Sequence, residues 1–315
     1  MVAPRVLVYY PDARTARAYA EAIDAPRRAL DVRVASTPAQ AMRLVGETEV
    51  LFAWGFPPPL LARAERLRWI QAMGAGVERF LAPALGSRVI LTRAAGIFGP
   101  WMAEYTLGWC LWVTQRVARF RRDQELRRWA PVDTLKLRGT TLCIVGLGDI
   151  GRHIARTARA LGMRVIGVTR TGRSVAGAER IYRARAIRAA LARADFAVVT
   201  VPLSAETRGL IGARELAAMK ASAWLINIAR GPVVDEAALL RSLRARRIAG
   251  AVLDVFDREP LPPRHPFWRL DNVVVTPHIS GPSTPGEIAP IFNENLRRYL
   301  AKRPLRYVVD RARGY

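Results

Sequence analysis

Thr140–Met163 reads TTLCIVGLGDIGRHIARTARALGM, and this stretch decides the fold. An apolar run leads into glycines at 146, 148 and 151, a helical pattern follows, and another apolar run begins at Arg164. A strand, a G-x-G-x-x-G turn, a helix and a second strand form the βαβ unit that binds a dinucleotide. The stretch therefore predicts a Rossmann unit, and the alternative is a glycine-rich turn that binds no ligand.

Each glycine of the turn has a predicted task. Gly146 allows the tight turn, Gly148 lets the backbone approach the pyrophosphate, and Gly151 lets the helix pack closely on the strand. The pyrophosphate is expected at the helix N-terminus, where free N–H groups and the helix dipole favour negative charge. The expected cofactor contacts of the loop are Gly146, Leu147, Gly148, Asp149, Ile150 and Gly151.

The strand that follows, VIGVTRTGR, ends in a basic loop. An acidic residue about 20 positions after the glycines normally binds the ribose 2′-OH of NAD. Here Arg170 lies 19 positions after Gly151, and no Asp or Glu occurs between Asp149 and Glu179. Arg170, Thr171 and Arg173 would instead bind a 2′-phosphate through charge-assisted hydrogen bonds. We therefore expect NADP(H) to be preferred over NAD(H), and chance placement of Arg in an Arg-rich chain is the alternative.

Composition restricts the class of protein. The chain has 315 residues, a formal net charge of +24 and only two cysteines, which are expected to be buried thiols. The basic residues are spread along the chain without a nucleic-acid-binding motif, so a nucleic-acid partner is not expected, although the charge should attract anionic ligands. No signal-like leader occurs and no apolar run reaches the roughly 18 residues that span a bilayer, which predicts a cytoplasmic protein without a membrane partner.

Apolar runs alternate with helical Ala/Arg/Leu stretches along nearly the whole chain. This alternation predicts an α/β fold with two domains, each built on a parallel sheet. Residues 99–128 show one long helical pattern that could join the domains. A last helical segment, EIAPIFNENLRRYLAKR, would make the first domain discontinuous if it crosses back to that domain.

Three apolar runs in the second half are followed by polar residues that suit catalysis. Arg230 follows WLINIA, Glu259 lies in the loop after AGAVLDVF, and His278 follows NVVVTP. Reduction of a 2-oxoacid needs a cation that binds the carboxylate, an acid that protonates the alkoxide, and a carboxylate that favours the charged, oriented imidazole. Arg230, His278 and Glu259 fit these three tasks, although each alone would more often be a surface or packing residue. His153 and His265, the other two histidines, receive no predicted role.

At these residues the chain resembles the D-isomer-specific 2-hydroxyacid dehydrogenase family. The resemblance covers nearly the whole length and is carried by GLGDIG, DFAVVTVPLSAETRGLI, LINIARGPVVDEAAL, GAVLDVFDREPLP and TPHISG. AMGAGVERF, MAEYTLGWCL and REPLPPRHPFW are similar to the bacterial glyoxylate/hydroxypyruvate reductase A branch, which favours NADPH. One departure is Glu78, where the family usually has Asp.

The resemblance implies a Rossmann coenzyme domain, 96–281, inserted in a flavodoxin-like substrate domain, 1–95 plus 282–315. It implies catalytic Arg230, Glu259 and His278, and a homodimer built through the coenzyme domain. Further implied cofactor contacts are Val201, Pro202, Thr207, Ala229, Asp254 and Gly281, with Asp254 accepting a bond from the carboxamide. The backbone of Gly74, Ala75 and Gly76 would bind the substrate carboxylate. Trp54, Met73, Trp129, Phe267 and Trp268 could narrow the pocket, with Trp129 supplied across the dimer.

The expected reaction is NADPH-dependent reduction of glyoxylate, hydroxypyruvate or a related small 2-oxoacid to the D-2-hydroxyacid. Two alternatives remain from the sequence. One is a dehydrogenase of the same fold that acts on a phosphoglycerate- or phenylpyruvate-type acid. The other is a non-enzymatic protein that uses the nucleotide as a sensor.

Overall fold

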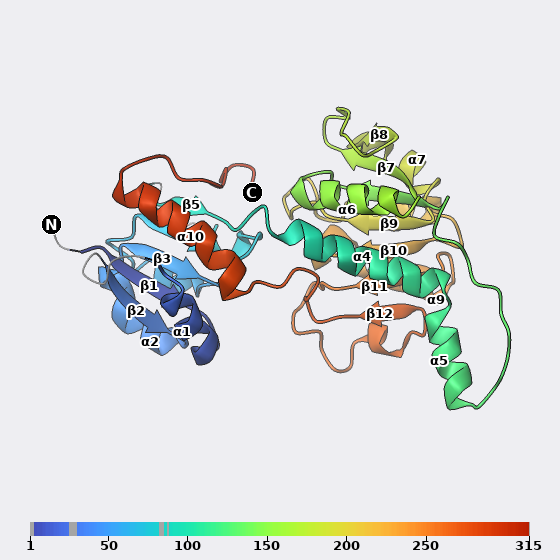
Figure 1. The fold of residues 1–315 in the computed structure, drawn as a ribbon, viewed down its shortest axis with the longest axis horizontal. Coiled ribbons are helices and arrows are strands. Elements are labelled where there is room, and N and C mark those ends of the chain that lie inside the picture. The colour runs from blue at the N-terminus through green and yellow to red at the C-terminus, as the bar shows by residue number, and fades with distance from the viewer. Residues whose placement is uncertain (1–2, 25–29, 82–84, 87, 315) are drawn as a thin grey trace. The chain divides into compact units, whose positions relative to one another are not determined.

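The computed structural model describes residues 3–24, 30–81, 85, 86 and 88–314. The chain forms two compact units, which are drawn in Figure 1. Unit 1 contains Met1–Ile97 and Ser283–Tyr315, and unit 2 contains the uninterrupted segment Phe98–Pro282. Unit 2 is therefore an insertion between two parts of unit 1.

Unit 1 is built on a five-stranded parallel sheet in the order β2-β1-β3-β4-β5. This is the flavodoxin-like order, in which the second strand lies at one edge. The strands are β1 (Arg5–Tyr9), β2 (Asp31–Ala35), β3 (Val50–Ala53), β4 (Trp69–Ala72) and β5 (Ile90–Thr92). β3 is wholly apolar, β1 is apolar after Arg5, and every residue of β4 is buried, including the polar Gln71, because helices cover both faces of the sheet.

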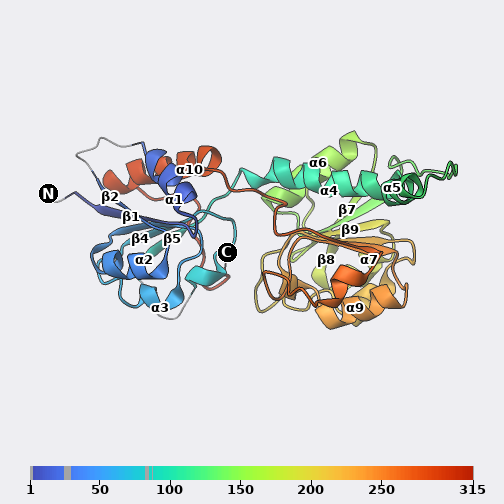
Figure 2. The same cartoon turned by 90° about the horizontal axis from the view of Figure 1, so that it is seen from below.

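Helices α1 (Ala13–Glu21) and α10 (Pro285–Leu300) cover one face of this sheet, and α2 (Pro38–Leu44) and α3 (Pro58–Leu61) cover the other (Figure 2). Two short 3₁₀ turns, Val45–Glu47 and Glu78–Phe80, complete the unit. From α10, Phe292 stacks on Phe52 and Trp69, with ring centroids 4.2 and 5.1 Å away. The C-terminal helix therefore completes the core of unit 1.

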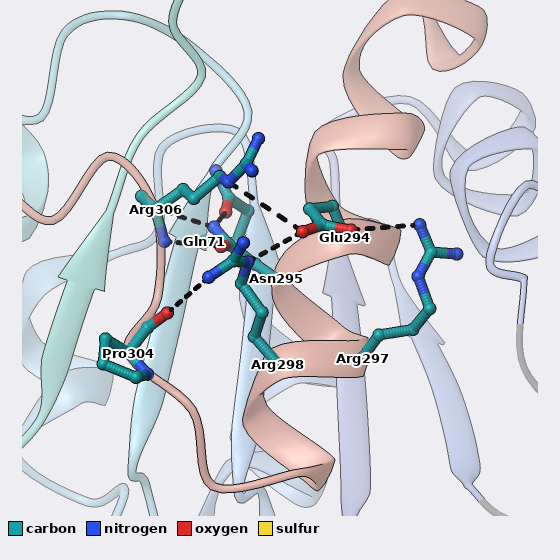
Figure 3. Close-up of polar contacts among 7 residues, drawn as sticks. All are labelled: Gln71, Glu294, Asn295, Arg297, Arg298, Pro304 and Arg306. Atoms are coloured by element: carbon teal, nitrogen blue, oxygen red, sulfur yellow. Dashed lines mark hydrogen bonds and ion pairs between the residues drawn. The ribbon is translucent and has the colours of Figure 1, made fainter.

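A buried polar network fastens the segment after α10 to the sheet (Figure 3). Asn295, which is fully buried, donates from Nδ2 to Gln71 Oε1 at 3.0 Å and to the Arg306 carbonyl at 3.1 Å. Its Oδ1 accepts the Arg306 N–H at 2.8 Å. Beyond this point Val308 forms an antiparallel bridge with Thr92 at the end of β5. One amide side chain thus joins β4, α10 and the segment after it.

Unit 2 is built on a seven-stranded parallel sheet in the order β12-β11-β10-β9-β6-β7-β8. Strands β6, β7 and β8 run in chain order from the centre of the sheet to one edge, and β9 to β12 run in chain order to the other edge. This is the Rossmann order with one added strand. The strands are β6 (Thr141–Val145), β7 (Arg164–Thr169), β8 (Arg180–Arg183), β9 (Phe196–Val199), β10 (Trp224–Asn227), β11 (Gly250–Leu253) and β12 (Val273–Val275). Together the two sheets confirm the predicted α/β fold class.

Helices α4 (Phe98–Thr114) and α6 (Asp149–Ala160) lie together on one face of this sheet, and α7 (Ile187–Leu191), α8 (Ala213–Ala218) and α9 (Glu236–Arg244) lie on the other (Figure 2). Short 3₁₀ segments are Ala184–Ala186, Gly231–Val233 and Pro266–Arg269. Among the helices in the described ranges, none has both the length and the apolarity needed to cross a bilayer.

The expectation of one long helix over residues 99–128 is wrong. The helix breaks at Arg116, whose φ of 56° is left-handed, and α5 (Val117–Glu125) continues in a new direction. The returning chain stabilises the break, because Leu135 N–H donates to the Thr114 carbonyl at 2.8 Å. Strands β2, β5 and β8 lie at the edges of their sheets and mix polar with apolar residues, so no continuous apolar run marks them in the sequence.

Candidate active site

The glycine-rich turn follows β6 and lies beside the end of the neighbouring strand β9. Gly146 follows β6 with a φ of 106°, and its carbonyl accepts the Thr200 hydroxyl at 2.6 Å. Thr200 follows β9, which pairs directly with β6. The strands that follow β6 in the chain extend the sheet to one edge, and those that follow β9 extend it to the other. The turn therefore lies at the topological switch point, where open α/β sheets bind ligands.

The packing around the turn fits a dinucleotide. A Cβ on Gly151 would approach the Gly146 carbonyl oxygen to 2.1 Å, so helix and turn require a glycine there. A Cβ on Gly148 would meet no atom within 4 Å, so the protein's own packing does not require that glycine. Gly148 is also the N-cap of α6 and supplies no side-chain cap, which leaves the first N–H groups of the helix available to an anion.

The basic loop after β7 is exposed, and its side chains surround a tight turn. Arg170, Thr171 and Arg173 are all exposed. Thr169 Oγ1 accepts the Gly172 N–H at 3.0 Å, and Gly172 has a φ of 71°. Arg183, at the end of the neighbouring strand, packs below the turn, since a Cβ on Gly172 would approach its Cγ to 2.5 Å.

The other predicted cofactor residues of unit 2 lie at the carboxyl ends of its strands. Val201 lies beside Gly146, whose added Cβ would approach the Val201 Cγ1 to 2.9 Å. Thr207 donates to the Pro202 carbonyl at 2.6 Å and accepts the Ser204 N–H at 2.8 Å, which closes the loop after β9. Ala229 is buried directly after β10. Gly281 packs against α4, where an added Cβ would lie 3.3 Å from Met102 and Phe98.

Glu259 and His278 are joined by a hydrogen bond. His278 Nδ1 lies 2.8 Å from Glu259 Oε2, and the two side chains are 39% and 34% exposed. Glu259 Oε1 accepts the Phe256 N–H at 3.0 Å, so both carboxylate oxygens are engaged. Because Nδ1 is bonded to the carboxylate, the opposite ring nitrogen, Nε2, is the one left to exchange a proton with a ligand.

Burial alone would raise the pKa of Glu259. The hydrogen bonds from His278 and from the Phe256 N–H, with the charges of His278 and Arg230, outweigh that effect and hold the pKa below its usual range. The carboxylate is therefore ionised over the whole neutral range.

Arg230 follows β10 and is held by its neighbours. Asn227 donates to the Arg230 carbonyl at 3.2 Å, and Arg230 Nη1 donates to the Ala229 carbonyl at 2.6 Å. The next residue, Gly231, touches the loop that carries Glu259, because an added Cβ would lie 2.0 Å from the Phe256 carbonyl carbon. The structure therefore brings together all three predicted catalytic residues. Gly231 was not foreseen, although a glycine directly after a strand-end arginine is a sign of close backbone approach.

Asp254 supports the turn that carries His278. Its carboxylate is fully buried, with Oδ1 accepting from Thr276 Oγ1 at 2.6 Å and the Ile279 N–H at 2.8 Å. Oδ2 accepts the Ser280 N–H at 2.9 Å. His278 itself has a φ of 55°, which is uncommon for a residue other than glycine. The observed bonds thus give Asp254 a positioning task, and a bond to a carboxamide would require one of these oxygens to become accessible.

The other predicted substrate-binding residues, Trp54, Met73 and Gly74–Gly76, belong to unit 1. Gly74, Ala75 and Gly76 form a partly exposed loop after β4, and Ala94 N–H donates to the Gly74 carbonyl at 3.1 Å. The Trp54 indole lies against this loop, 3.0 Å from the position of a Cβ on Gly74. Met73, in contrast, is fully buried.

The remaining aromatic candidates differ in exposure. Trp268 is 51% exposed and Trp129 is 98% exposed, whereas Phe267 is only 2% exposed in the core of unit 2. Met73 and Phe267 are thus buried in the cores of their units, and their role in narrowing the pocket stays a prediction. Among the residues that the structure describes, no group of three or more His, Cys, Asp or Glu side chains could hold a metal ion.

Comparison with known proteins agrees with this geometry. Residues 107–280 match the family described as D-isomer specific 2-hydroxyacid dehydrogenase, NAD binding domain. The glyoxylate reductase of Aeropyrum pernix is 38% identical over 231 residues, which cover 70% of this chain and 68% of that protein. The glyoxylate/hydroxypyruvate reductase A of Salmonella heidelberg is 30% identical over 266 residues, which cover 82% of this chain and 85% of that protein.

A solved structure is similar over the whole chain. The NADPH-dependent glyoxylate/hydroxypyruvate reductase of Sinorhizobium meliloti, in complex with NADP and sulfate, superposes with a TM-score of 0.91 at 30% identity. The match covers 99% of this chain and 100% of that one.

Proposed function

The chain belongs to the D-isomer specific 2-hydroxyacid dehydrogenase family, and from this premise we propose that it reduces glyoxylate, hydroxypyruvate or a similarly small 2-oxoacid with NADPH. Membership makes it an oxidoreductase with an NAD(P)-binding Rossmann unit, which removes the non-enzymatic alternative. The observation that carries the proposal is the Glu259–His278 pair beside Arg230, at the strand ends of the dinucleotide-binding sheet.

The three side chains divide the chemistry. The bound dihydronicotinamide supplies the hydride to the carbonyl carbon. Arg230 binds the carboxylate of the 2-oxoacid and polarises its carbonyl, because its planar guanidinium is permanently charged. His278 donates its Nε2 proton to the forming alkoxide, while Glu259 on Nδ1 orients the ring and stabilises the imidazolium.

Replacing His278 by alanine tests this assignment. We expect loss of most of kcat while the fold and the Kd for NADPH stay as in the wild type, since the residue is partly exposed. Asp271→Asn, which alters a side chain that is 77% exposed at the surface of unit 2, is the control for general disturbance. Turnover of His278→Ala close to wild type would refute the proton-donor role.

The preference for NADPH rests on the exposed loop after β7. Arg170 and Arg173 present two guanidinium groups near the expected ribose, and Arg183 adds a third beneath Gly172. A carboxylate in this loop would repel a 2′-phosphate, and the loop contains none. The Sinorhizobium meliloti relative, which is described as NADPH-dependent, supports the same preference.

The test compares Arg170→Ala with Arg164→Ala, because Arg164 is an exposed arginine at the opposite end of the same strand. A lost charge-assisted bond of about 1.5–3 kcal/mol lowers kcat/KM for NADPH roughly tenfold to hundredfold. The value for NADH should change little in either variant. Equal effects of both substitutions would mean that long-range steering by the net charge, and no local contact, accounts for the preference.

The Gly74–Gly76 loop is proposed to bind the substrate carboxylate through its backbone N–H groups, with Trp54 against it. A panel of 2-oxoacids followed at the NADPH absorbance tests the substrate class. We expect glyoxylate and hydroxypyruvate to give the highest kcat/KM. Higher values for phenylpyruvate or for the phosphoglycerate-derived 2-oxoacid would favour the alternative dehydrogenase.

We also propose a homodimer formed through unit 2. Trp101, Leu111 and Phe120 on α4 and α5 are 40–43% exposed, and Trp129 is 98% exposed on the segment that projects beyond the sheet in Figure 1. Exposed aromatic side chains in such number favour coverage by a partner. Sedimentation should give twice the chain mass of 35.0 kDa, and a monomer at micromolar concentration would contradict the proposal. A cytoplasmic location is supported by Cys110 and Cys143, which are free, buried thiols, and cell fractionation tests it.

A further inference from the structure

The loop that carries Glu259 is held at its far end by another histidine–carboxylate pair. His265 Nε2 lies 3.0 Å from Glu236 Oε1, and the two side chains are 16% and 30% exposed. We propose that His265 and Glu236 are positioning residues that fix the loop 254–265 on helix α9, so that Glu259 stays in contact with His278. The inference rests on the proposed function for its catalytic consequence.

The anchor on the helix side is rigid. Glu236 is the first residue of α9, and the preceding Asp235 caps this helix by accepting the Ala238 N–H at 2.8 Å. A side chain in the first turn of a capped helix has a fixed origin, so its carboxylate is a defined point of attachment. The pair therefore attaches the loop to α9, a helix that packs into the core of unit 2.

The loop side is equally well defined. His265 Nδ1 accepts the Phe267 N–H at 3.3 Å and caps the short helix Pro266–Arg269. An Nδ1 that accepts carries no proton, so in this arrangement the proton lies on Nε2 and is donated to Glu236. The His265 ring also lies against the Phe267 ring, with centroids 4.7 Å apart. One imidazole thus makes three contacts that together fix its plane.

Bonds within the loop connect this anchor to the catalytic carboxylate. His265 N–H and Trp268 Nε1 both donate to the Pro262 carbonyl, at 2.9 and 3.0 Å. At the other end, the Phe256 N–H binds Glu259 and the backbone of Gly231 abuts residue 256. Glu259 therefore lies between two fixed points, and loosening either one frees its carboxylate to move.

The charges around the pair show why His265 is needed there. Burial raises the pKa of Asp257 in the loop, and so do Glu236 and Asp235, while Arg208 and His265 act in the opposite direction. The loop and the start of α9 therefore bring carboxylates together. Removing His265 takes away the hydrogen bond that holds the loop on Glu236 against this repulsion, which favours displacement of the loop from the helix.

Three variants test the proposal. Glu236→Ala removes the anchor, Glu236→Gln keeps an oxygen that accepts the Nε2 proton, and His265→Asn keeps a side-chain cap for the Phe267 N–H but cannot reach Glu236. We expect Glu236→Ala and His265→Asn to lower kcat roughly tenfold through misplacement of Glu259, with the Kd for NADPH unchanged. Glu236→Gln should restore most of the loss.

A second readout does not depend on turnover. The chain has only three histidines, so the imidazole signals of His153, His265 and His278 can be assigned by NMR. We expect the His278 signals to move in Glu236→Ala and not in Glu236→Gln. If the protein reduces no 2-oxoacid, the proposed function fails while this measurement still decides the inference. Unchanged His278 signals and unchanged kcat in Glu236→Ala would overturn it, as would equal effects of the Ala and Gln variants.

Discussion

Replacing Asp254 by asparagine should destabilise unit 2 and slow turnover. The carboxylate is fully buried and accepts three hydrogen bonds, two of them from the backbone N–H groups of Ile279 and Ser280. An asparagine has one oxygen and one NH₂ group. In either orientation of its amide, one of these N–H groups therefore faces another donor.

The magnitude follows from the lost bond and the group left unpaired. A hydrogen bond to a charged acceptor contributes about 1.5–3 kcal/mol, and a buried unsatisfied donor costs about 1–3 kcal/mol. Relief from burying a charge offsets part of the sum. A net loss of about 3 kcal/mol is expected, which in a domain of this size lowers Tm by roughly 6–12 °C.

Thermal unfolding and urea titration measure the loss, and kcat is measured on the folded variant. Turnover should fall because these bonds hold the left-handed turn at His278. Asp271→Asn is the matched control, since Asp271 is 77% exposed and pairs only at the surface with Arg246. If Asp254→Asn is as stable and as active as this control, the supporting role of the buried carboxylate is wrong.

Further substitutions separate folding from ligand binding. Gly151→Ala should unfold the turn or lose dinucleotide binding, because its Cβ would collide with the Gly146 carbonyl, whereas Gly148→Ala should keep the Tm of the wild type and bind NADPH more weakly in a fluorescence titration. The lowered pKa of Glu259 means that its contribution to stability is complete above the ordinary glutamate range and is lost as the pH falls through the lowered pKa of the folded state. Urea midpoints of the wild type and Glu259→Gln should therefore converge on acidification; a constant difference would contradict the assignment. Asn295→Ala should cost about 2–4 kcal/mol by removing its hydrogen bonds to Gln71 and to the backbone of Arg306, and a wild-type unfolding midpoint would show that the network is dispensable.

The sheets could be predicted from the sequence because their central strands are continuous apolar runs. The strands before Gly146 and before Arg230 are largely buried, and no alternation of polar and apolar residues obscures them. β2, β5 and β8 lie at or near the edges of the sheets, where polar residues are tolerated, so their composition resembled that of loops. The helix break at Arg116 could not be predicted, because no glycine or proline marks it in the sequence. The contact that stabilises it comes from Leu135, which is distant along the chain.

In the candidate site, too, some residues could be predicted from the sequence and others could not. Residue type and position after a strand were enough to select Arg230, Glu259 and His278, because few residues in the chain combine such chemistry with such a place. The supports of the site depend on approaches between distant segments. Neither the contact of Gly231 with the Glu259 loop nor the pairing of His265 with Glu236 can be deduced from spacing along the chain.

The discontinuity of unit 1 has a consequence for synthesis on the ribosome. Residues 98–282 are translated as one continuous block, so unit 2 can fold as soon as it emerges. The sheet of unit 1 is made first but must wait for Phe292 to fill the stack between Phe52 and Trp69, and for Asn295 to pair with Gln71. We expect nascent chains halted before residue 285 to be protease-sensitive in the first hundred residues and resistant in the inserted block. Unit 1, whose sheet is translated first, should thus complete its folding after unit 2.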